Sequence, residues 1–171
     1  MLAIQRGKSA MRIQYAQSRR PYRFSSPFEG KPFAILLYGV DEAVAPEEQG
    51  QLCTDIIEQG CRYAVCAGAN CEIWHDCFDE ADCARNDWEA NVSNFVMTSW
   101  HEKESLEDVV FFLLNNTSFD SVEADCCMVL VVGEDPNALE TIRREVARQC
   151  KANAPESESP VKSAPRGGRS R

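Results

Sequence analysis

The sequence lacks most of the short motifs that identify nucleotide-binding, redox and hydrolytic proteins. No segment matches G-x-G-x-x-G or the phosphate loop G-x-x-x-x-G-K-[ST], which disfavours ordinary binding of NAD, FAD or ATP. No cysteine pair has the C-x-x-C spacing of zinc knuckles and thioredoxin-like sites, and no G-x-S-x-G elbow is present. No apolar run approaches the roughly 18 residues that cross a bilayer, so we expect no membrane-spanning helix.

Cysteine is abundant in spite of these absences. The chain has nine cysteines in 171 residues, a length that suits one domain. Because no secretory signal precedes them, we expect reduced thiols in a cytoplasmic protein. Most of them are expected to be small buried hydrophobic residues.

Charge divides the chain into three parts. Residues 1–31 contain seven basic residues and one acid, and residues 151–171 contain five basic residues and two acids. The middle, 32–150, contains six basic residues and 24 acids, a formal charge of −18. Such a core repels nucleic acid and anionic membranes and suits cations, a basic protein or the chain's own ends. Solubility and acids at helix starts explain the same composition.

The ends differ from the middle in pattern as well as charge. We predict a largely irregular basic leader at 1–31, an acidic α/β domain at 32–150 and a disordered basic tail at 151–171. The leader is rich in Arg and nearly free of acids, as organellar transit peptides are. A start mis-assigned upstream of Met11 and a flexible arm are the two other interpretations.

Within the middle, apolar runs alternate with helical patterns. Strands are predicted at 33–40, 62–67, 95–100 and 126–132, and each is followed by an amphipathic helix. The helices are expected at 46–59, 71–83, from Ser105 onward and at 136–150. Four βα units predict a three-layer sandwich with a four-stranded, mostly parallel sheet, Rossmann-like or flavodoxin-like, in the order 2-1-3-4.

That order predicts a ligand crevice between the carboxyl ends of the first and third strands. The only two histidines, each directly after a tryptophan, fall near this edge. The expected ligand-binding residues are Asp41, Cys71, His75, His101 and Glu102.

A metal site is one chemistry open to these residues. Cys71 and His75 lie four positions apart on a predicted helix and so share a face, and His101 would approach them across the crevice. Thiolate, imidazole and carboxylate ligands suit Zn²⁺. An oxygen-only set drawn from Asp41, Glu42, Glu102 and Asp135 would suit Mg²⁺. A hydrogen-bonded structural histidine explains the same pattern.

Thiol catalysis is a second chemistry, with His101, His75 and Cys71 as candidate catalytic residues. Cys71 at a helix N-terminus could act as nucleophile and either imidazole as base. The acidic surroundings oppose this, because negative charge raises a thiol pKa.

The second predicted helix also carries a dense acidic face. Its carboxylates belong to Asp76, Asp79, Glu80 and Asp82. This face could receive a basic protein, and a solvated surface accounts for it equally well.

Two segments carry a resemblance to known sequences. Residues 60–76 (GCRYAVCAGANCEIWHD) and 97–108 (MTSWHEKESLED) show the patterns G-C-x-Y, C-E-x-x-H-D and T-x-W-H-x-x-E. Over roughly 33–150 the chain resembles an uncharacterised family of bacterial α/β domains. The resemblance implies a bacterial cytosolic protein and no particular activity. The shared polar positions it implies are Cys71, Glu72, His75, Asp76, Trp100, His101 and Glu104.

The function is unknown at this level, and the sequence favours a small cytoplasmic binding or interaction domain with a crevice at the carboxyl edge of the sheet. The alternative is a metal- or thiol-dependent hydrolase that uses His101, His75 and Cys71 in the same crevice. No cofactor is predicted, and a divalent metal is the alternative. The expected partners are a small molecule or a basic protein, with no nucleic acid for the core, no membrane and the oligomeric state open.

Overall fold

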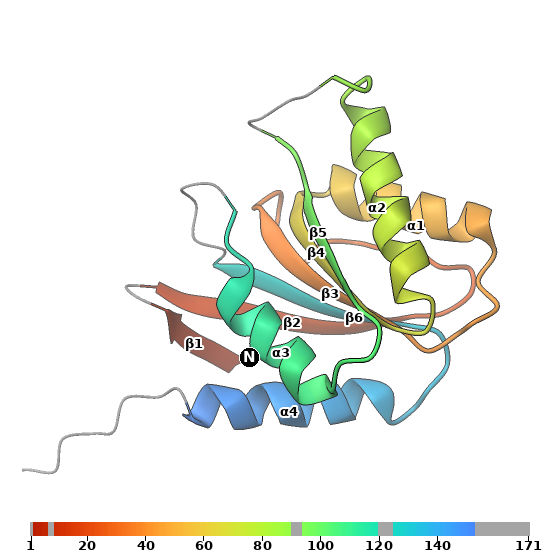
Figure 1. The fold of residues 1–171 in the computed structure, drawn as a ribbon. Coiled ribbons are helices and arrows are strands. Elements are labelled where there is room, and N and C mark those ends of the chain that lie inside the picture. The colour runs from red at the N-terminus through yellow and green to blue at the C-terminus, as the bar shows by residue number, and fades with distance from the viewer. Residues whose placement is uncertain (1, 7–8, 90–93, 120–124, 153–171) are drawn as a thin grey trace, which may run out of the picture.

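The computed structural model describes residues 2–6, 9–89, 94–119 and 125–152. It contains one sheet with helices on both faces (Figure 1). The strands are β1 (Leu2–Arg6), β2 (Ser9–Ser18), β3 (Phe33–Gly39), β4 (Cys61–Gly68), β5 (Met97–His101) and β6 (Cys126–Val132). The helices are α1 (Pro46–Glu58), α2 (Cys71–Arg85), α3 (Leu106–Asn116) and α4 (Ala138–Ala152). The α/β class, the parallel sheet and the four helices are therefore confirmed.

The strand number and order differ from the prediction. The sheet has six strands in the order β1-β2-β6-β3-β4-β5. All neighbours are parallel except β1, which pairs with β2 antiparallel. The four predicted strands thus lie in the order 3-2-1-4, as the first four strands of a Rossmann sheet do, and the predicted order 2-1-3-4 is wrong.

Burial explains this order. All seven residues of β6 are buried, so a strand must cover each of its edges and a layer each of its faces. In β5 only His101 is buried and Trp100 is exposed, as suits a strand at the edge of the sheet. The predicted order placed β6 at the edge and β5 inside the sheet. That order is inconsistent with a fully buried β6 and a mostly exposed or half-buried β5.

The leader is also different from the prediction, because residues 9–18 form β2 inside the sheet. Residues 12–18 of β2 pair with 126–132 of β6. Met11 and Ile13 are 2% and 1% exposed and belong to the core. Alternation of apolar and polar residues in Met-Arg-Ile-Gln is typical of a strand, and the basic composition of the segment concealed it. The predicted disordered tail lies, apart from the end of α4, outside the described residues.

Two hydrophobic cores lie on the two faces of the sheet. On one face α1, α2 and the connection 19–32 cover a core that includes Phe28, Phe33 and Trp74. On the other face α3 and α4 cover a core that includes Ile13, Val65 and Leu113. The predicted three-layer arrangement is confirmed, with an irregular connection filling the place of a helix between β2 and β3.

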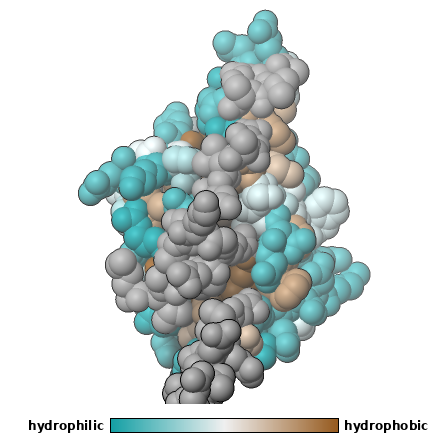
Figure 2. Space-filling model, turned by 90° about the vertical axis from the view of Figure 1, so that its left-hand side faces the viewer, coloured by the Kyte–Doolittle hydropathy of each residue, from teal (hydrophilic) through white to brown (hydrophobic). Residues whose placement is uncertain are grey.

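In Figure 1 the parallel strands run from the left (β2 and β6) or from the top (β5) toward the lower right, where loops lead into α1, α2 and α4. Seen from the side where the strands begin, the described surface is mostly hydrophilic, with hydrophobic residues in small patches (Figure 2). Among the described residues, no helix is long and apolar enough to cross a membrane.

Candidate functional site

Three glycines allow the strand ends to pack closely at the carboxyl edge of the sheet. A Cβ at Gly39 would collide with the carbonyl oxygen of Ala69, and one at Gly68 with the carbonyl oxygen of Gly39. Gly133 has a φ of +116°, and a Cβ there would lie 2.7 Å from the Cβ of Asp41. The ends of β3, β4 and β6 therefore approach each other more closely than side chains would allow.

The topological switch point lies at this edge, between β3 and β6. The chain leaves β3 toward α1 on one face and leaves β6 toward α4 on the other. Ligands of open α/β sheets bind outside the carboxyl ends of the strands at such a point. The sequence predicted a crevice at this edge, but between the first and third predicted strands, which β4 separates.

A cavity of about 320 Å³ lies beside the switch point, on the face that α3 and α4 cover. Its floor is backbone and side chain from the ends of β3 and β4, and its walls come from the starts of α3 and α4. The residues with polar side chains are few: Tyr38, Asp135, Asn137 and Thr141. The remaining lining is apolar or backbone, from Gly39, Val40, Gly68, Ala69, Leu106, Ala138 and Ile142.

The electrostatics of the cavity disfavour an anion. Among the described residues, no Lys or Arg lines it, and Asp135 is the one charged residue that does. The Oδ1 atom of Asp135 accepts hydrogen bonds from the backbone N–H groups of Asn137 (2.8 Å) and Ala138 (3.2 Å) at the start of α4. The helix N-terminus that could otherwise hold a phosphate is thus occupied by a carboxylate of the chain itself. Ser105 caps the start of α3 in the same way, accepting from the N–H of Asp108.

The two histidines lie on opposite faces of the sheet, so they do not share a crevice. Side chains alternate along β5. Trp100 faces α2, where its ring centroid lies 4.6 Å from that of His75. His101 faces α3, where its ring centroid lies 4.7 Å from that of Phe112. The geometry therefore brings His75 to Trp100 and separates it from His101.

Each imidazole is held by polar neighbours. In His101, Nδ1 lies 2.8 Å from Oε2 of Glu104 and Nε2 lies 3.2 Å from Oγ of Ser99, and the residue is 6% exposed. In His75, Nδ1 lies 3.0 Å from Oδ1 of Asp76 and Nε2 lies 3.6 Å from Oδ2 of Asp79. Both nitrogens of His101 are engaged within β5 and the turn that follows it, as in a structural histidine.

The other three predicted ligand-binding residues come together only in part: the Cys71 thiol lies against the backbone of His101 and close to the charge of Glu102, whereas β4 separates Asp41 from both. Cys71 is 2% exposed, and burial raises the pKa of its thiol, which opposes a nucleophilic role. Asp41 follows β3, where its carboxylate accepts from the Tyr22 hydroxyl (2.6 Å) and the Ala43 N–H (2.8 Å). These hydrogen bonds, that of Tyr22 first, lower the pKa of Asp41. Glu102 is exposed and pairs with Lys103.

The positions of the predicted site residues do not support a metal site or a catalytic thiol. Among the described residues, no group of three or more His, Cys, Asp or Glu side chains could hold a metal ion. All nine cysteines are free, six of them buried, and only Cys83 is exposed. The expectation that most thiols are buried hydrophobic residues is confirmed.

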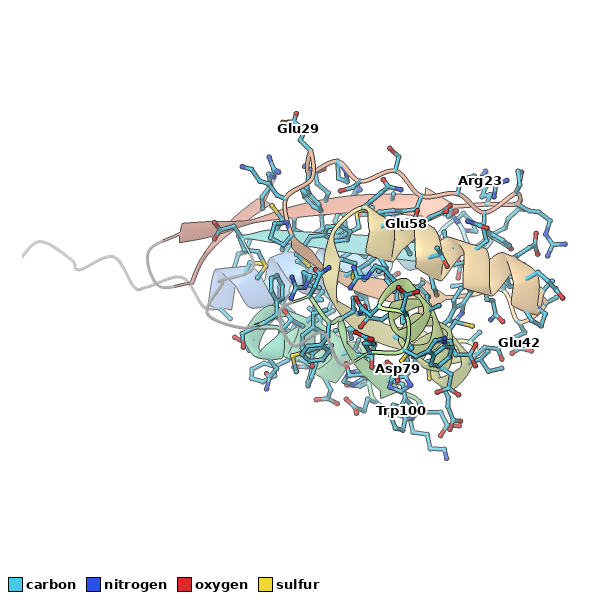
Figure 3. The ribbon with its side chains drawn as sticks, turned by 90° about the horizontal axis from the view of Figure 1, so that it is seen from above. Arg23, Glu29, Glu42, Glu58, Asp79 and Trp100 are labelled. Atoms are coloured by element: carbon cyan, nitrogen blue, oxygen red, sulfur yellow. The ribbon has the colours of Figure 1, made fainter. Side chains whose placement is uncertain are left out.

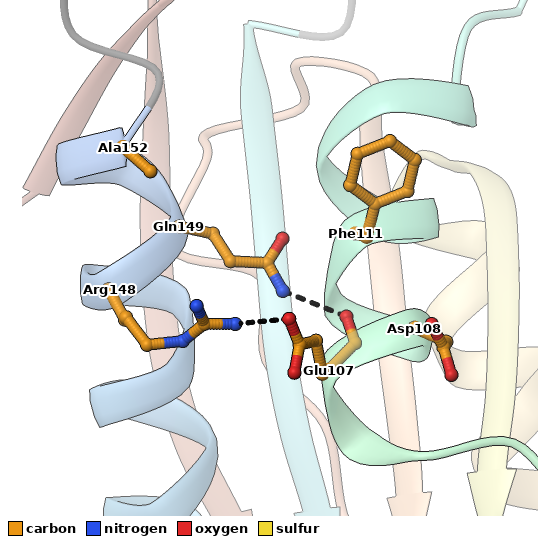
Figure 4. Close-up of a pocket in the computed structure, with 6 residues that line it drawn as sticks. All are labelled: Glu107, Asp108, Phe111, Arg148, Gln149 and Ala152. Atoms are coloured by element: carbon orange, nitrogen blue, oxygen red, sulfur yellow. Dashed lines mark hydrogen bonds and ion pairs between the residues drawn. The ribbon is translucent and has the colours of Figure 1, made fainter.

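A second cavity, of about 240 Å³, lies between α3 and α4 (Figure 4). Two of its charged side chains pair with each other: Arg148 lies 2.8 Å from a carboxylate oxygen of Glu107, while Asp108 accepts from the Ser105 hydroxyl. Nε2 of Gln149 donates to the carbonyl oxygen of Glu107 at 2.8 Å. This groove lies along the contact between two helices rather than at the carboxyl ends of the strands, and it is the weaker candidate.

Sequence reasoning missed the residues that line the main cavity, apart from Asp135. Asn137 and Thr141 belong to the start of α4, which the sequence predicted only as a capped helix. The signal was present in the glycines at the ends of three strands, because positions 39, 68 and 133 each follow an apolar run. The interpretation of the edge relied instead on the histidines.

Comparison with known families gives one result. Residues 13–149 match the family model described as a domain of unknown function, DUF7684, and the chain belongs to this family. Its membership in an uncharacterised domain family, which the sequence resemblance implied, is thus confirmed. The match begins within β2, so it includes most of the segment predicted as a leader. Searches of curated proteins and of solved structures gave no match.

Proposed function

We propose that this protein is a binding domain for a small organic molecule, neutral or positively charged, held in the cavity at the carboxyl edge of the sheet. The observation that carries the proposal is the position of the cavity beside the β3–β6 switch point. Its lining supports the proposal, because an apolar surface with a few convergent polar groups is typical of small-molecule sites.

The character of the ligand follows from the lining. The Tyr38 hydroxyl and the side chains of Asn137 and Thr141 offer hydrogen bonds in both directions. Asp135 would favour an amine or another cation over a carboxylate or phosphate. The proposal invokes no metal or cofactor, and it places no nucleophile or base against the ligand.

We also propose a cytoplasmic location, as the sequence suggested. Nine free thiols, six of them buried, suit a compartment that keeps cysteines reduced. A bacterial origin, implied by the sequence resemblance, stays a prediction.

A variant with a blocked cavity tests the proposal. A library of neutral, cationic and anionic small molecules is screened by thermal shift against the natural protein and two variants. Thr141→Trp places a bulky ring at the cavity mouth, whereas Arg144→Trp adds the same ring at an exposed α4 position outside the cavity. At a concentration of 100 Kd a ligand stabilises the native state by about 2.7 kcal/mol, a clear shift in Tm.

We expect neutral or cationic compounds that raise the Tm of the natural protein and of Arg144→Trp, but not of Thr141→Trp. Compounds that stabilise Thr141→Trp equally would place binding elsewhere. Stabilisation by anions alone would contradict the proposed chemistry of the site.

A further inference from the structure

The outer edge of β5 is one of the two edges of the sheet. β5 is the last strand in the order, and within the described part of the chain no strand pairs with its outer side. In Figure 1 it lies at the front of the sheet, next to α2. An edge strand presents backbone N–H and C=O groups that can pair with an added strand.

The sequence of β5 does little to protect this edge. Residues 97–101 contain no Pro, Lys or Arg, the residues that commonly block strand addition. Large hydrophobic side chains stand exposed beside it: Trp100 is 49% exposed and Phe95, just before the strand, is 44% exposed. Exposed aromatic residues next to an open strand are typical of a contact surface for another chain.

The charge around this edge is negative. On α2, Asp76 and Asp79 flank His75, and beyond the end of β5 lie Glu102 and Glu104. The cations nearby are already engaged: Lys103 pairs with Glu102, Arg85 pairs with Asp82, and Arg62 donates to the carbonyl oxygen of Phe95. In the view from above, Asp79 and Trp100 lie on the same side of the molecule (Figure 3). A polyanion would be repelled here. A second copy paired through the same edge would bring like charges together, so the charge favours a basic partner.

A cavity of about 400 Å³ lies between the start of β5 and the second half of α2. Asp79 and Asp82 line it together with Phe95, Val96 and Met97, of which Met97 turns its side chain to the core on the other face of the sheet. Asp82 already accepts from the N–H of Val96 and pairs with Arg85. Oδ1 of Asp79 accepts from the Thr98 hydroxyl at 2.7 Å and Oδ2 lies 3.6 Å from Nε2 of His75, and a carboxylate with two such partners still has lone pairs for a further donor. A Lys or Arg side chain fits this mixture, because its stem is apolar and its head is cationic.

Trp100 offers a second position for a cation. Its indole lies beside the His75 ring at an angle of 61° between the planes, and half of the residue is open to solvent. A cation over an exposed indole face gains a cation–π interaction. Thr98 and Trp100 lie two residues apart and so point to the same face of the sheet. An added strand would place alternate side chains along this same face.

We propose that the β5 edge binds an extended basic segment of another protein as an additional strand. Two cationic side chains at positions i and i+2 of that segment lie over Asp79 and Trp100, and backbone hydrogen bonds to β5 hold it. This surface is separate from the small-molecule cavity, which lies on the opposite face of the sheet, and the proposal does not depend on that ligand.

Fluorescence anisotropy with a synthetic probe tests the proposal. The probe is a labelled peptide of sequence Lys-Val-Arg-Val-Lys-Val, and the same peptide with Glu at the basic positions is its control. Asp79→Asn keeps a partner for Thr98 but removes the charge, and Trp100→Ala removes the ring. Asp55→Asn on α1 and Phe111→Ala on α3 are matched controls at surface positions away from β5.

We expect saturable binding of the basic peptide, weakened about tenfold by Asp79→Asn or Trp100→Ala and unchanged in the two controls. Binding should also weaken as salt concentration rises. The Glu peptide should not bind.

Backbone pairing is tested separately with two N-methylated peptides, modified on alternate residues. Only one alternate set of N–H groups faces β5, so one peptide should lose binding and the other keep it. Equal binding by both, no saturable binding of the basic probe, or equal affinity in Asp79→Asn and Asp55→Asn would overturn the proposal. Concentration-dependent dimerisation abolished by Trp100→Ala would identify a second copy as the occupant and would also overturn it.

Discussion

At the scale of single residues, the glycines at the strand ends do more to shape the site than the histidines do. The imidazoles of His75 and His101 contact carboxylates and aromatic rings on opposite faces of the sheet. Gly39 and Gly68 allow two strand ends to meet at the edge where the cavity opens. Substitution of a glycine is therefore the sharper probe of this edge.

Gly39→Ala should destabilise the protein by about 1–3 kcal/mol, because the added methyl group meets the Ala69 carbonyl oxygen. The free energy of unfolding is measured by urea titration. Gly50→Ala is the matched control: nothing lies within 4 Å of a Cβ at that α1 position. It should stabilise the helix by about 0.5–1 kcal/mol. Equal effects of the two substitutions would contradict the close approach at Gly39.

The hydrogen bond between Tyr22 and Asp41 predicts a pH effect. The pKa of Asp41 is lowered in the folded protein, first by the Tyr22 hydroxyl and then by the Ala43 N–H. A lowered folded pKa stabilises the protein above the unfolded value of about 3.9 and loses that effect as pH falls through the folded value.

Tyr22→Phe should therefore raise the pKa of Asp41 toward its ordinary value and shift acid unfolding to higher pH. The pKa is measured from the side-chain carboxyl ¹³C shift of Asp41, and Tyr38→Phe, at a position outside this contact, is the control. An unchanged Asp41 pKa in Tyr22→Phe would show that the hydroxyl does not bind the carboxylate in solution.

At the scale of elements, hydrophobic periodicity was a good guide to helices and buried strands and a poor one to polar strands. The predicted strand at 126–132 is β6 residue for residue, because its continuous apolar run suits no other place than the centre of the sheet. The helix boundaries were close for the same reason: Pro46 and Ser105 mark the helix starts that the capping pattern predicts. The composition of β2, with Arg12 and two glutamines, hid its alternation.

β2 yields the clearest test at this scale. Ile13→Ala should cost about 2–5 kcal/mol, because the side chain is 1% exposed in the core under α4. Gln14→Ala, one residue along the same strand, should change stability by no more than about 0.5 kcal/mol. Both values come from urea titration. If both substitutions were neutral, residues 9–18 would be the flexible leader that their composition suggested.

At the scale of the whole molecule, the order of the strands decides where a ligand can bind. The sequence pattern does not determine this order. Short βα connections fix the direction of each crossover but not which edge each new strand joins. With β6 and β5 exchanged, Asp41 and His101 would meet at one crevice. In the observed order β4 separates them, and Asp41 instead lies beside Gly133. The sequence predicted a crevice at the carboxyl edge, and a cavity lies at that edge, but the residues that line it depend on this order.

The most direct test of the binding site is a ¹H–¹⁵N correlation experiment with a titration of the compound that gives the largest thermal shift. The chemical shift changes should be largest at the amides of Gly39, Val40, Gly68, Ala69 and Thr141. They should saturate together with one Kd. Changes concentrated at Phe111 and Gln149, or at no single place, would contradict a ligand site at the β3–β6 switch point.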